Sequence, residues 1–215
     1  MIPDITLYSA LVLDFDGVIK DSNRVKLLSF QQCFSGFPDS LLDDIAEHHI
    51  SNLGLPRASK LELYRTWALT YTTDVPSLDA LIARFGALCN AAVVSSEWTH
   101  KAPSALSTLS KLLPIYLCTA TPDDEIKLIL SKLSISSLFA DVYGSSFRKS
   151  DALLSIRAEL PGPNPFLLFV GDSRNDMESA NKVGCDFCLF SNNENFNLVQ
   201  PPLVITSLFD LISNC

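Results

Sequence analysis

The chain has 215 residues, which is long enough for one domain with a sizeable core or for a core with a small second unit. Hydrophobic residues make up 47% of it and charged residues 19%, which excludes an intrinsically disordered chain. The formal net charge of −8 argues against a general binder of nucleic acid or of anionic membranes, because phosphate contacts require clustered Lys and Arg.

The N-terminal segment is predicted to belong to the folded chain rather than to a targeting sequence. It lacks a basic region, and its apolar stretch runs into Asp14 after a few residues. The sequence also lacks a run of about 18 or more uninterrupted apolar residues, the length that spans a membrane. We therefore expect a cytoplasmic protein with no membrane partner and no nucleic-acid partner.

The first predicted strand, Leu11–Asp14, ends in a pair of carboxylates, Asp14 and Asp16. A strand that is buried on both faces consists of continuous aliphatic residues, and an open α/β sheet binds ligands at the carboxyl ends of its strands. Side chains alternate across a strand, so both carboxylates would lie on one side, and Gly17 lets the chain turn tightly after them. Because the two acids repel each other, a hard cation such as Mg²⁺ would stabilise them. The alternative is an ordinary turn, in which Asp and Gly are common.

Residues 20–99 contain no convincing strand. Their apolar residues recur at helical spacing, as in Leu41, Leu42 and Ile45. A crossover between parallel strands normally needs one helix, so the extra length predicts an inserted helical subdomain above the strand end that carries Asp14. The core would then consist of residues 1–19 and 100–215.

The rest of the chain alternates strands with helices. Further strands are predicted at Ile115–Thr119, Val142–Gly144, Phe166–Gly171 and Phe187–Phe190. Helices are predicted at Pro103–Leu113, Asp123–Leu133, Asp151–Leu160, Asn175–Val183 and Leu208–Ile212. This alternation predicts an α/β fold with a doubly wound, mostly parallel sheet. The polar segment 191–197 is predicted to be a loop.

Two pairs of potential ligands are weak candidates for a site. Cys185 and Cys188 form a lone C-x-x-C without a second pair or a nearby His, so buried thiols are a better interpretation than a zinc or redox site. His48 and His49 are adjacent and would lie on different helix faces, which does not favour a ligand role.

Four groups of polar residues follow predicted strands, at the edge where an open α/β sheet builds its site. They are Asp14 with Asp16, Thr119 with a free backbone N–H assigned to Ala120, Lys149, and Asp172 with Asp176. Each group alone has an ordinary explanation as a turn, a helix cap, a surface lysine or a first-turn acid. Together they supply what phosphoryl transfer to a carboxylate requires, namely a nucleophile, cations that offset the repulsion between anions, and donors for the phosphate oxygens.

As an ordered set, these motifs resemble the haloacid dehalogenase superfamily in its phosphatase branch. The match covers nearly the whole chain and consists of D-x-D-G-V at Asp14–Val18, Thr119, Lys149, and G-D-S-x-x-D at Gly171–Asp176. The resemblance implies a Rossmann-like core and an aspartyl-phosphate intermediate. It also implies that residues 20–99 form an α-helical cap of the phosphoglycolate phosphatase and β-phosphoglucomutase type.

The resemblance also implies roles for the motif residues. Asp14 would attack phosphorus, and Asp16 would protonate the leaving oxygen and then deprotonate the attacking water. Mg²⁺ would be held by the Asp14 carboxylate, the Asp16 backbone carbonyl and Asp172, with Asp176 supporting this shell. The transferring phosphate would be bound by Thr119, Ala120 and Lys149.

The motifs also indicate the position of the chain within that superfamily. Dehalogenases and phosphonatases typically lack a carboxylate at the position of Asp16, so its presence favours phosphate esters. Lys149 is followed by Ser150 rather than by the Pro of many relatives, and Thr119 by Ala-Thr-Pro rather than Thr-Asn. The exact subfamily is therefore left open.

Substrate choice in capped relatives rests largely on the cap. The segment Gly54–Lys60 resembles a G-x-S-R-x-x-K motif of some phosphoglycolate phosphatase-like members, and Asp21-Ser22 with Lys26 resembles their D-S-x-x-x-K start. Arg57 and Lys60 are three residues apart and would share a helix face, so with Lys26 they are candidates to bind an anionic leaving group. The alternative is a solvated basic face.

The combined prediction is a Mg²⁺-dependent phosphatase that acts on a small phosphorylated metabolite. The alternative is a phosphomutase that uses the same intermediate, but Lys26 stands roughly where the mutase pattern carries a His, which favours hydrolysis. A phospho-acceptor receiver domain also combines acids, a hydroxyl and a Lys, yet such domains are much shorter and lack the insertion. The sequence predicts neither the identity of the substrate nor an oligomeric state.

Overall fold

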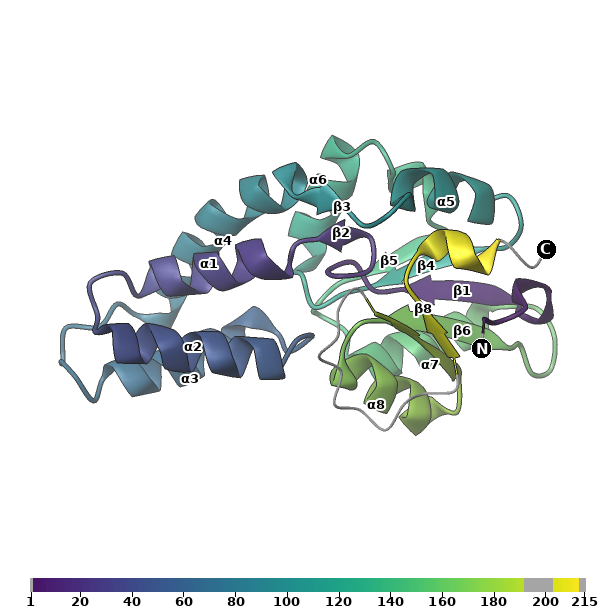
Figure 1. Ribbon diagram of the computed structural model, residues 1–215. Helices are drawn as coiled ribbons and strands as arrows, with labels where there is room; N and C mark the ends of the chain where they lie inside the picture. The colour runs from purple at the N-terminus through teal and green to yellow at the C-terminus, as the bar shows by residue number, and fades with distance from the viewer. Residues whose placement is uncertain (1, 192–202, 213–215) are drawn as a thin grey trace.

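The computed structural model describes residues 2–191 and 203–212. Figure 1 shows a sheet with helices on both faces and a group of four helices, α1 to α4, that extends from one end of the sheet. The strands are β1 (Ala10–Leu13), β2 (Lys20–Asp21), β3 (Glu97–Trp98), β4 (Ile115–Cys118), β5 (Asp141–Tyr143), β6 (Leu167–Gly171), β7 (Asp186–Phe190) and β8 (Leu203–Ile205). The α-helices are α1 (Asn23–Cys33), α2 (Asp39–Ser51), α3 (Arg57–Ala68), α4 (Leu78–Ser95), α5 (Ala102–Leu109), α6 (Asp123–Lys132), α7 (Lys149–Glu159) and α8 (Arg174–Val183). Short 3₁₀ helices span Ile5–Leu7, Ser136–Leu138 and Leu208–Leu211.

The main sheet has six strands in the order β5-β4-β1-β6-β7-β8, and every neighbouring pair is parallel. Strand β1 lies between β4 and β6, with Leu11 opposite Ile115 on one side and Leu168 on the other. The chain extends the sheet from β1 toward β5 in one direction and from β6 toward β8 in the other. The carboxyl end of β1, where Asp14 follows, is therefore the point at which the strand order reverses, and open α/β sheets bind ligands there.

Both faces of β1 are buried, which explains its uninterrupted aliphatic sequence. Leu11 and Leu13 contribute to a core that includes the apolar residues of α5 and α6, whereas Ala10 and Val12 contribute to a second core with α7 and α8. The period of two along β1 thus assigns alternate residues to the two helical layers.

Helices α1 to α4 pack together around aromatic side chains. The ring centroid of Phe30 lies 4.3 Å from that of Phe85 and 5.5 Å from that of Tyr64. The two ends of the insertion lie side by side, because β2 pairs with β3 in an antiparallel ribbon that sets Lys20 opposite Trp98. The hydroxyl of Thr99 donates to the carbonyl of Val18 across the same junction at 2.6 Å.

The predicted α/β class with a doubly wound parallel sheet is confirmed. The strands predicted at 115–119, 142–144, 166–171 and 187–190 correspond to β4, β5, β6 and β7, with shifts of at most one residue at their ends. The expectation that residues 20–99 hold no strand is wrong at the two ends of that range. Two-residue strands such as β2 and β3 are too short to show an alternating pattern, and they form only because tertiary packing brings residues far apart in sequence together.

Two predicted helices differ from the structure in length or type. The helix predicted over 103–113 ends at Leu109, because a turn follows in which the N–H groups of Leu112 and Leu113 both donate to the carbonyl of Leu109. The helix predicted over 208–212 is a 3₁₀ helix capped by Ser207, and β8 was not predicted. Of the predicted loop 191–197, all but Ser191 lies outside the described residues.

Helix α4 is the one helix among the described residues that is long and apolar enough to cross a membrane by length and composition. It carries Asp79 and Arg84, and its buried side chains, among them Phe85 and Cys89, belong to the core shared with α1 and α3. The core helix of a soluble protein passes the same test, so this finding is a weak indication of a membrane span.

Candidate active site

Asp14 stands directly after β1, where neighbouring strands hold it on both sides. Its backbone N–H donates to the carbonyl of Val170 on β6 at 2.9 Å, which continues the ladder one residue past the strand. The side chain is buried, with 3% of the residue exposed. Burial raises the pKa of Asp14 to about 7, with a further rise from Asp176 and Asp16, and the ammonium of Lys149 opposes this rise.

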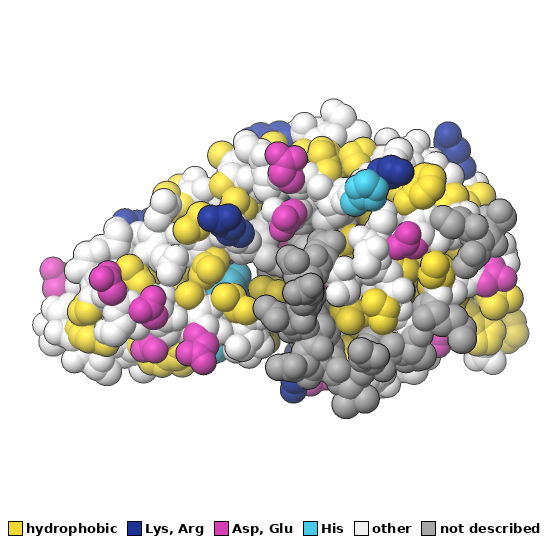
Figure 2. Space-filling view, in the orientation of Figure 1, with side chains coloured by type: hydrophobic (Ala, Val, Ile, Leu, Met, Phe, Trp, Pro, Cys, Tyr) yellow, Lys and Arg dark blue, Asp and Glu magenta, His cyan; other side chains and the backbone are white. Residues whose placement is uncertain are grey.

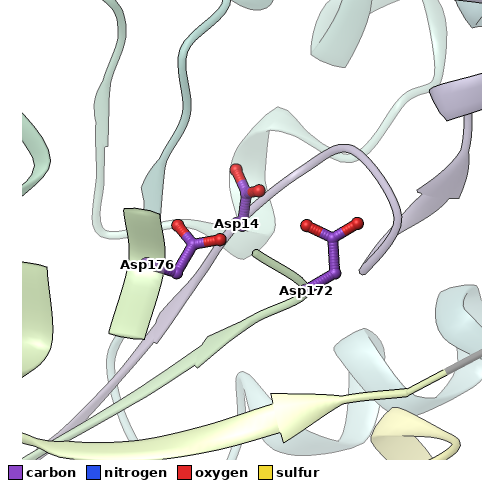
Figure 3. A group of neighbouring side chains, drawn as sticks. All are labelled: Asp14, Asp172 and Asp176. Carbon is purple, nitrogen blue, oxygen red and sulfur yellow. The ribbon is translucent and has the colours of Figure 1, made fainter. Parts of the chain in front are cut away.

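Three buried carboxylates, Asp14, Asp172 and Asp176, meet at this edge of the sheet. Each offers an oxygen, and these oxygens lie within 4.8 Å of one another (Figure 3). Burial, followed by repulsion from Asp14 and Asp176, raises the pKa of Asp172 well above its usual value. Such crowding is unfavourable for three ionised acids, and a bound cation would relieve it.

Lys149, the first residue of α7, joins this group. Its Nζ lies 3.0 Å from Oδ1 of Asp14 and donates a hydrogen bond to Asp176. Burial by itself lowers the pKa of Lys149, but Asp14 and Asp176 raise it above its usual value, so the ammonium stays charged. A positive charge therefore lies directly beside the predicted nucleophile.

Local sequence explains how two of the acids are held. Ser173 and Asp176 form a capping box at the start of α8, in which Oγ of Ser173 accepts from the N–H of Asp176 and the Ser173 N–H donates to Asp176 Oδ2. Gly17 has a φ of +77°, and a Cβ there would lie 1.9 Å from Oδ2 of Asp172. Only glycine allows both this backbone conformation and this close approach.

Asp16 faces a different set of partners from those of Asp14. Ser22 donates to its Oδ1 at 2.6 Å, and Lys26 forms an ion pair with its Oδ2. Burial acts to raise the pKa of Asp16, but the charge and hydrogen bond of Lys26, together with Ser22, hold it below the usual value. Lys26 also donates to the hydroxyl of Thr121 at 3.1 Å, and so connects α1 to the segment after β4.

The segment after β4 presents a buried hydroxyl at Thr119, 2% exposed, and an amide group at Ala120. The N–H of Thr119 donates to the carbonyl of Tyr143, and its hydroxyl accepts from the N–H of Thr121 at 3.2 Å. Within residues 2–191 and 203–212, no hydrogen bond uses the N–H of Ala120. The free amide expected here is therefore that of Ala120.

A cavity of about 50 Å³ lies between the sheet edge and the helical insertion. Predicted site residues of both parts line it, namely Asp14, Asp16, Asp172, Lys26, Arg57 and Lys60. Thr119 and Lys149 instead line a neighbouring hollow of about 290 Å³, and Ala120 and Gly54 line both. The structure thus brings the residues of the core motifs together and sets Lys26, Arg57 and Lys60 of the insertion opposite them.

Lys26, Arg57 and Lys60 do not lie on a solvated face. Arg57 forms an ion pair with Glu125 of α6, so a contact joins the insertion to the core. Lys60 is 3% exposed and lies 3.1 Å from Nδ1 of His49, which is itself buried and lines the cavity. The predicted shared face of Arg57 and Lys60 is present, and it points to the cavity rather than to water.

The sequence analysis did not identify several residues that line the cavity, because no motif or spacing marks them. Asn23 donates to Oδ2 of Asp172 at 2.7 Å across 149 residues of chain. Glu125 and Thr121 acquire their roles only through their contacts with Arg57 and Lys26. In the described part of the chain, the three-acid group is the one cluster of potential metal ligands, and Cys185 and Cys188 are buried free thiols outside it.

The face of the molecule seen in Figure 2 has scattered acidic and basic side chains rather than one basic patch. Clustered Lys and Arg are the electrostatic mark of nucleic-acid binders, and this face lacks them in the part that the structure describes.

Comparisons with known proteins give a consistent result. The family model described as "Haloacid dehalogenase-like hydrolase" matches residues 11–190. The chain is 30% identical over 132 residues to the phosphoglycolate phosphatase of Escherichia coli K12, an alignment that covers 55% of this chain and 52% of that protein. It therefore spans about half the length of this curated relative. It is 26% identical to the phosphoglycolate phosphatase of Photorhabdus laumondii, with 95% of this chain and 91% of that protein covered.

Solved structures share the fold. A haloacid dehalogenase-like hydrolase from Streptococcus pneumoniae has a TM-score of 0.73 at 19% identity, with 97% of this chain and 98% of that chain covered. The hydrolase YfnB from Bacillus subtilis, whose structure was solved bound to magnesium, has a TM-score of 0.74 at 16% identity, with 96% and 97% covered.

Proposed function

Because the chain belongs to the haloacid dehalogenase-like hydrolase family, we propose that it is a Mg²⁺-dependent phosphatase that hydrolyses a small phosphomonoester through an aspartyl-phosphate intermediate. The observation that carries this proposal is the buried contact between Asp14 and Lys149 at the switch point of the sheet, with Asp172 and Asp176 beside it. We also propose that residues 20–99 act as a cap over a core formed by residues 1–19 and 100–215.

In the first step, a carboxylate oxygen of Asp14 attacks phosphorus and the bond from phosphorus to the ester oxygen breaks. The ion pair with Lys26 keeps Asp16 of the free protein ionised, so the proton for this step comes with the monoanionic form of the phosphate ester: Asp16 takes it up and passes it to the ester oxygen, and the leaving group departs as an alcohol. Lys149, the hydroxyl of Thr119 and the N–H of Ala120 bind the phosphate oxygens and offset the negative charge that gathers on them.

In the second step, Asp16, now ionised, takes a proton from water. The resulting hydroxide attacks phosphorus and releases phosphate and the Asp14 carboxylate. The ion pair with Lys26 favours the ionised form of Asp16 and so supports this half of the cycle. Arg57, Lys60 and Lys26 line the cavity that would hold the leaving group.

The residues at the three-acid group fit a magnesium ion. All three side chains offer carboxylate oxygens, the ligands that Mg²⁺ prefers, and their mutual repulsion in a buried site calls for a cation. Asp14, Asp172 and the backbone carbonyl of Asp16 would hold it, with Asp176 in support. When bound, the ion would neutralise part of the charge of Asp14 and of the substrate phosphate.

The phosphoglycolate phosphatases that this chain resembles suggest a small phosphorylated acid as the first substrate to test. Phosphate release should be measured over a panel of phosphoglycolate, sugar phosphates and nucleotides, with Mg²⁺ and with EDTA. We expect Mg²⁺-dependent release from at least one small ester and no turnover by the Asp14→Asn variant. Isomerisation without release would favour the phosphomutase alternative, and absence of release from every ester would refute the proposal.

A further inference from the structure

A side-chain hydrogen bond joins the helical insertion to the group of three acids. Nδ2 of Asn23, the first residue of α1, donates to Oδ2 of Asp172 at 2.7 Å. The same oxygen lies against Gly17, because a Cβ at that position would be 1.9 Å from it and 2.7 Å from Nδ2 of Asn23. Oδ2 of Asp172 is therefore held between the turn after β1 and the amide of a residue in the insertion.

This hydrogen bond fixes the orientation of a carboxylate in a crowded site. The carboxyl group of an aspartate turns about its Cβ–Cγ bond in a broad energy well, so neighbouring donors decide where its two oxygens point. Repulsion from Asp14 and Asp176 acts on Asp172, since oxygens of all three lie within 4.8 Å of one another (Figure 3). The amide of Asn23 holds the group in place and stabilises its ionised form, which is the form that binds a metal.

The other two acids have different donors. The ammonium of Lys149 contacts both Asp14 and Asp176, and the N–H of Ser173 donates to Asp176. Within residues 2–191 and 203–212, the hydrogen bond from Asn23 is the one that a side chain donates to Asp172. The orientation of Asp172 thus depends on a residue outside the core motifs.

Contacts from three helices of the insertion set the position of Asn23. Ser22, directly before it, donates to Oδ1 of Asp16 at 2.6 Å and so holds the start of α1 at the sheet edge. Burial, followed by the charge of Lys60, lowers the pKa of His49 on α2 to about 3, and a backbone hydrogen bond with Asn23 opposes this shift. Nδ1 of the same ring lies 3.1 Å from the ammonium of Lys60 on α3. Asn23 is therefore supported from behind by buried polar groups.

We propose that Asn23 is a positioning residue of the metal site, which orients Asp172 for Mg²⁺, so that a residue of the insertion completes a site whose ligands lie in the core. The proposal rests on the proposed function, because it takes the three-acid group as the place of the ion. Loss of the hydrogen-bond partner of a metal ligand typically weakens metal binding by about 10- to 100-fold. The strength of Mg²⁺ binding then depends on the contact between the insertion and the core as well as on the core motifs.

The test measures Mg²⁺ binding by calorimetric titration of wild type, Asn23→Ala and Asn23→Leu in the absence of substrate. We expect both variants to bind Mg²⁺ about 10- to 100-fold more weakly, because neither keeps the amide donor, although Leu keeps the size of the side chain. Asn175→Ala is the matched control. Asn175 donates its amide to the carbonyl of Gly54 at 3.2 Å and so also joins the core to the insertion, but this contact does not involve Asp172. The Mg²⁺ affinity of the control should stay within about twofold of wild type.

Activity with p-nitrophenyl phosphate gives a second readout. The Mg²⁺ concentration for half-maximal activity should rise in Asn23→Ala by the same factor as the dissociation constant, and kcat at saturating Mg²⁺ should fall by a smaller factor. Urea unfolding without Mg²⁺ checks that both variants are folded. A contact that only braces the insertion would lower the unfolding midpoint of Asn23→Ala and leave its Mg²⁺ affinity as in wild type, and that result overturns the proposal. Wild-type affinity in Asn23→Leu overturns it too, because the amide donor then has no part in metal binding.

Failure of this role and failure of the phosphatase proposal are distinguishable. If the wild-type protein binds Mg²⁺ but hydrolyses no ester, the phosphatase proposal fails on its own, and the comparison of Mg²⁺ affinities still decides the role of Asn23. If the wild-type protein binds no Mg²⁺, the magnesium site fails and the role of Asn23 fails with it.

Discussion

Burial of the Lys60 ammonium should make the free protein less stable at neutral and low pH than a variant without this charge. The substitution is Lys60→Met, which keeps an unbranched side chain of similar length in the core beside Phe30 and removes the ammonium. Burial is the main cause that lowers the pKa of Lys60 from 10.5 to about 7. The charge of Lys26 lowers it further, and the charges of Asp16 and Asp172 oppose the shift. The folded state therefore disfavours the protonated form, while the unfolded chain keeps the ordinary pKa.

The sign and size of the effect follow from proton linkage. Between pH 7 and pH 10.5 the unfolded state binds more protons than the folded state, so the stability of the wild-type protein rises with pH in this window. Below pH 7 both states are protonated and the full penalty applies, on the order of 5 kcal/mol for a shift from 10.5 to about 7. At pH 9 the remaining penalty is roughly 2 kcal/mol by the same relation. Lys60→Met also loses the contacts of Lys60 with His49 and Phe30, which lowers the stability of the variant by a similar amount at every pH. The decisive quantity is therefore the change with pH in the difference between the unfolding free energies of variant and wild type.

The measurement is urea unfolding of wild type and Lys60→Met at pH 6 and pH 9, in buffers without carboxylate or phosphate. We expect Lys60→Met to raise the free energy of unfolding, relative to wild type, by roughly 3 kcal/mol more at pH 6 than at pH 9. The control is Arg24→Met, which removes a positive charge from an exposed position on α1. Its effect on the free energy of unfolding should be the same at both pH values. An equal effect of Lys60→Met at the two pH values would refute the view that burial disfavours the charged form of Lys60 in the folded protein.

Three further predictions concern the frame of the site. Gly17→Ala should destabilise the protein by at least about 1–3 kcal/mol in chemical denaturation, since a Cβ would strain a φ of +77° and lie 1.9 Å from Oδ2 of Asp172; an unchanged midpoint would mean that this turn relaxes freely. Lys26→Met should cost roughly 1–3 kcal/mol at pH 7 because it leaves a buried carboxylate at Asp16. Because the pKa of Asp16 is lowered in the folded protein, the contribution of this ion pair to stability is present above pH 3.8 and is lost as pH falls through the folded pKa. The free energies of unfolding of wild type and Lys26→Met, plotted against pH, should therefore converge in acid. A constant difference between them would contradict the ion pair. Leu13→Ala, at a fully buried position of β1, should cost roughly 2–5 kcal/mol, and a loss well below 1 kcal/mol would contradict its packing in the core.

The core of the fold was predictable because its signals are local. Continuous aliphatic runs such as Leu167–Val170 indicate strands buried on both faces, and Pro122 followed by acids indicates the start of α6. The elements that the sequence did not predict depend on contacts between distant residues. The ribbon of β2 and β3 is two residues long on each side and exists because Lys20 and Trp98 are brought together.

The candidate site divides in the same way. The positions of Asp14, Lys149 and Asp176 at one sheet edge follow from strand order, since parallel strands present their carboxyl ends on the same side. Strand order does not predict which hydrogen-bond or ion-pair partner each side chain has. Lys26 was expected to face the substrate, and it also forms an ion pair with Asp16, ten residues away in the chain.

What the sequence determined by itself is the chemistry available at the edge of the sheet. The spacing of Asp14 and Asp16, and of Asp172 and Asp176, lies within single strand-to-turn segments, where local geometry decides the conformation. Only the tertiary structure decided which residues of the insertion line the cavity and what they contact, because Lys60 and His49 lie on different helices and Arg57 meets Glu125 across 68 residues. That information depends on how α2 and α3 pack over the end of β1, and side-chain packing between distant segments leaves no periodic signal in the sequence.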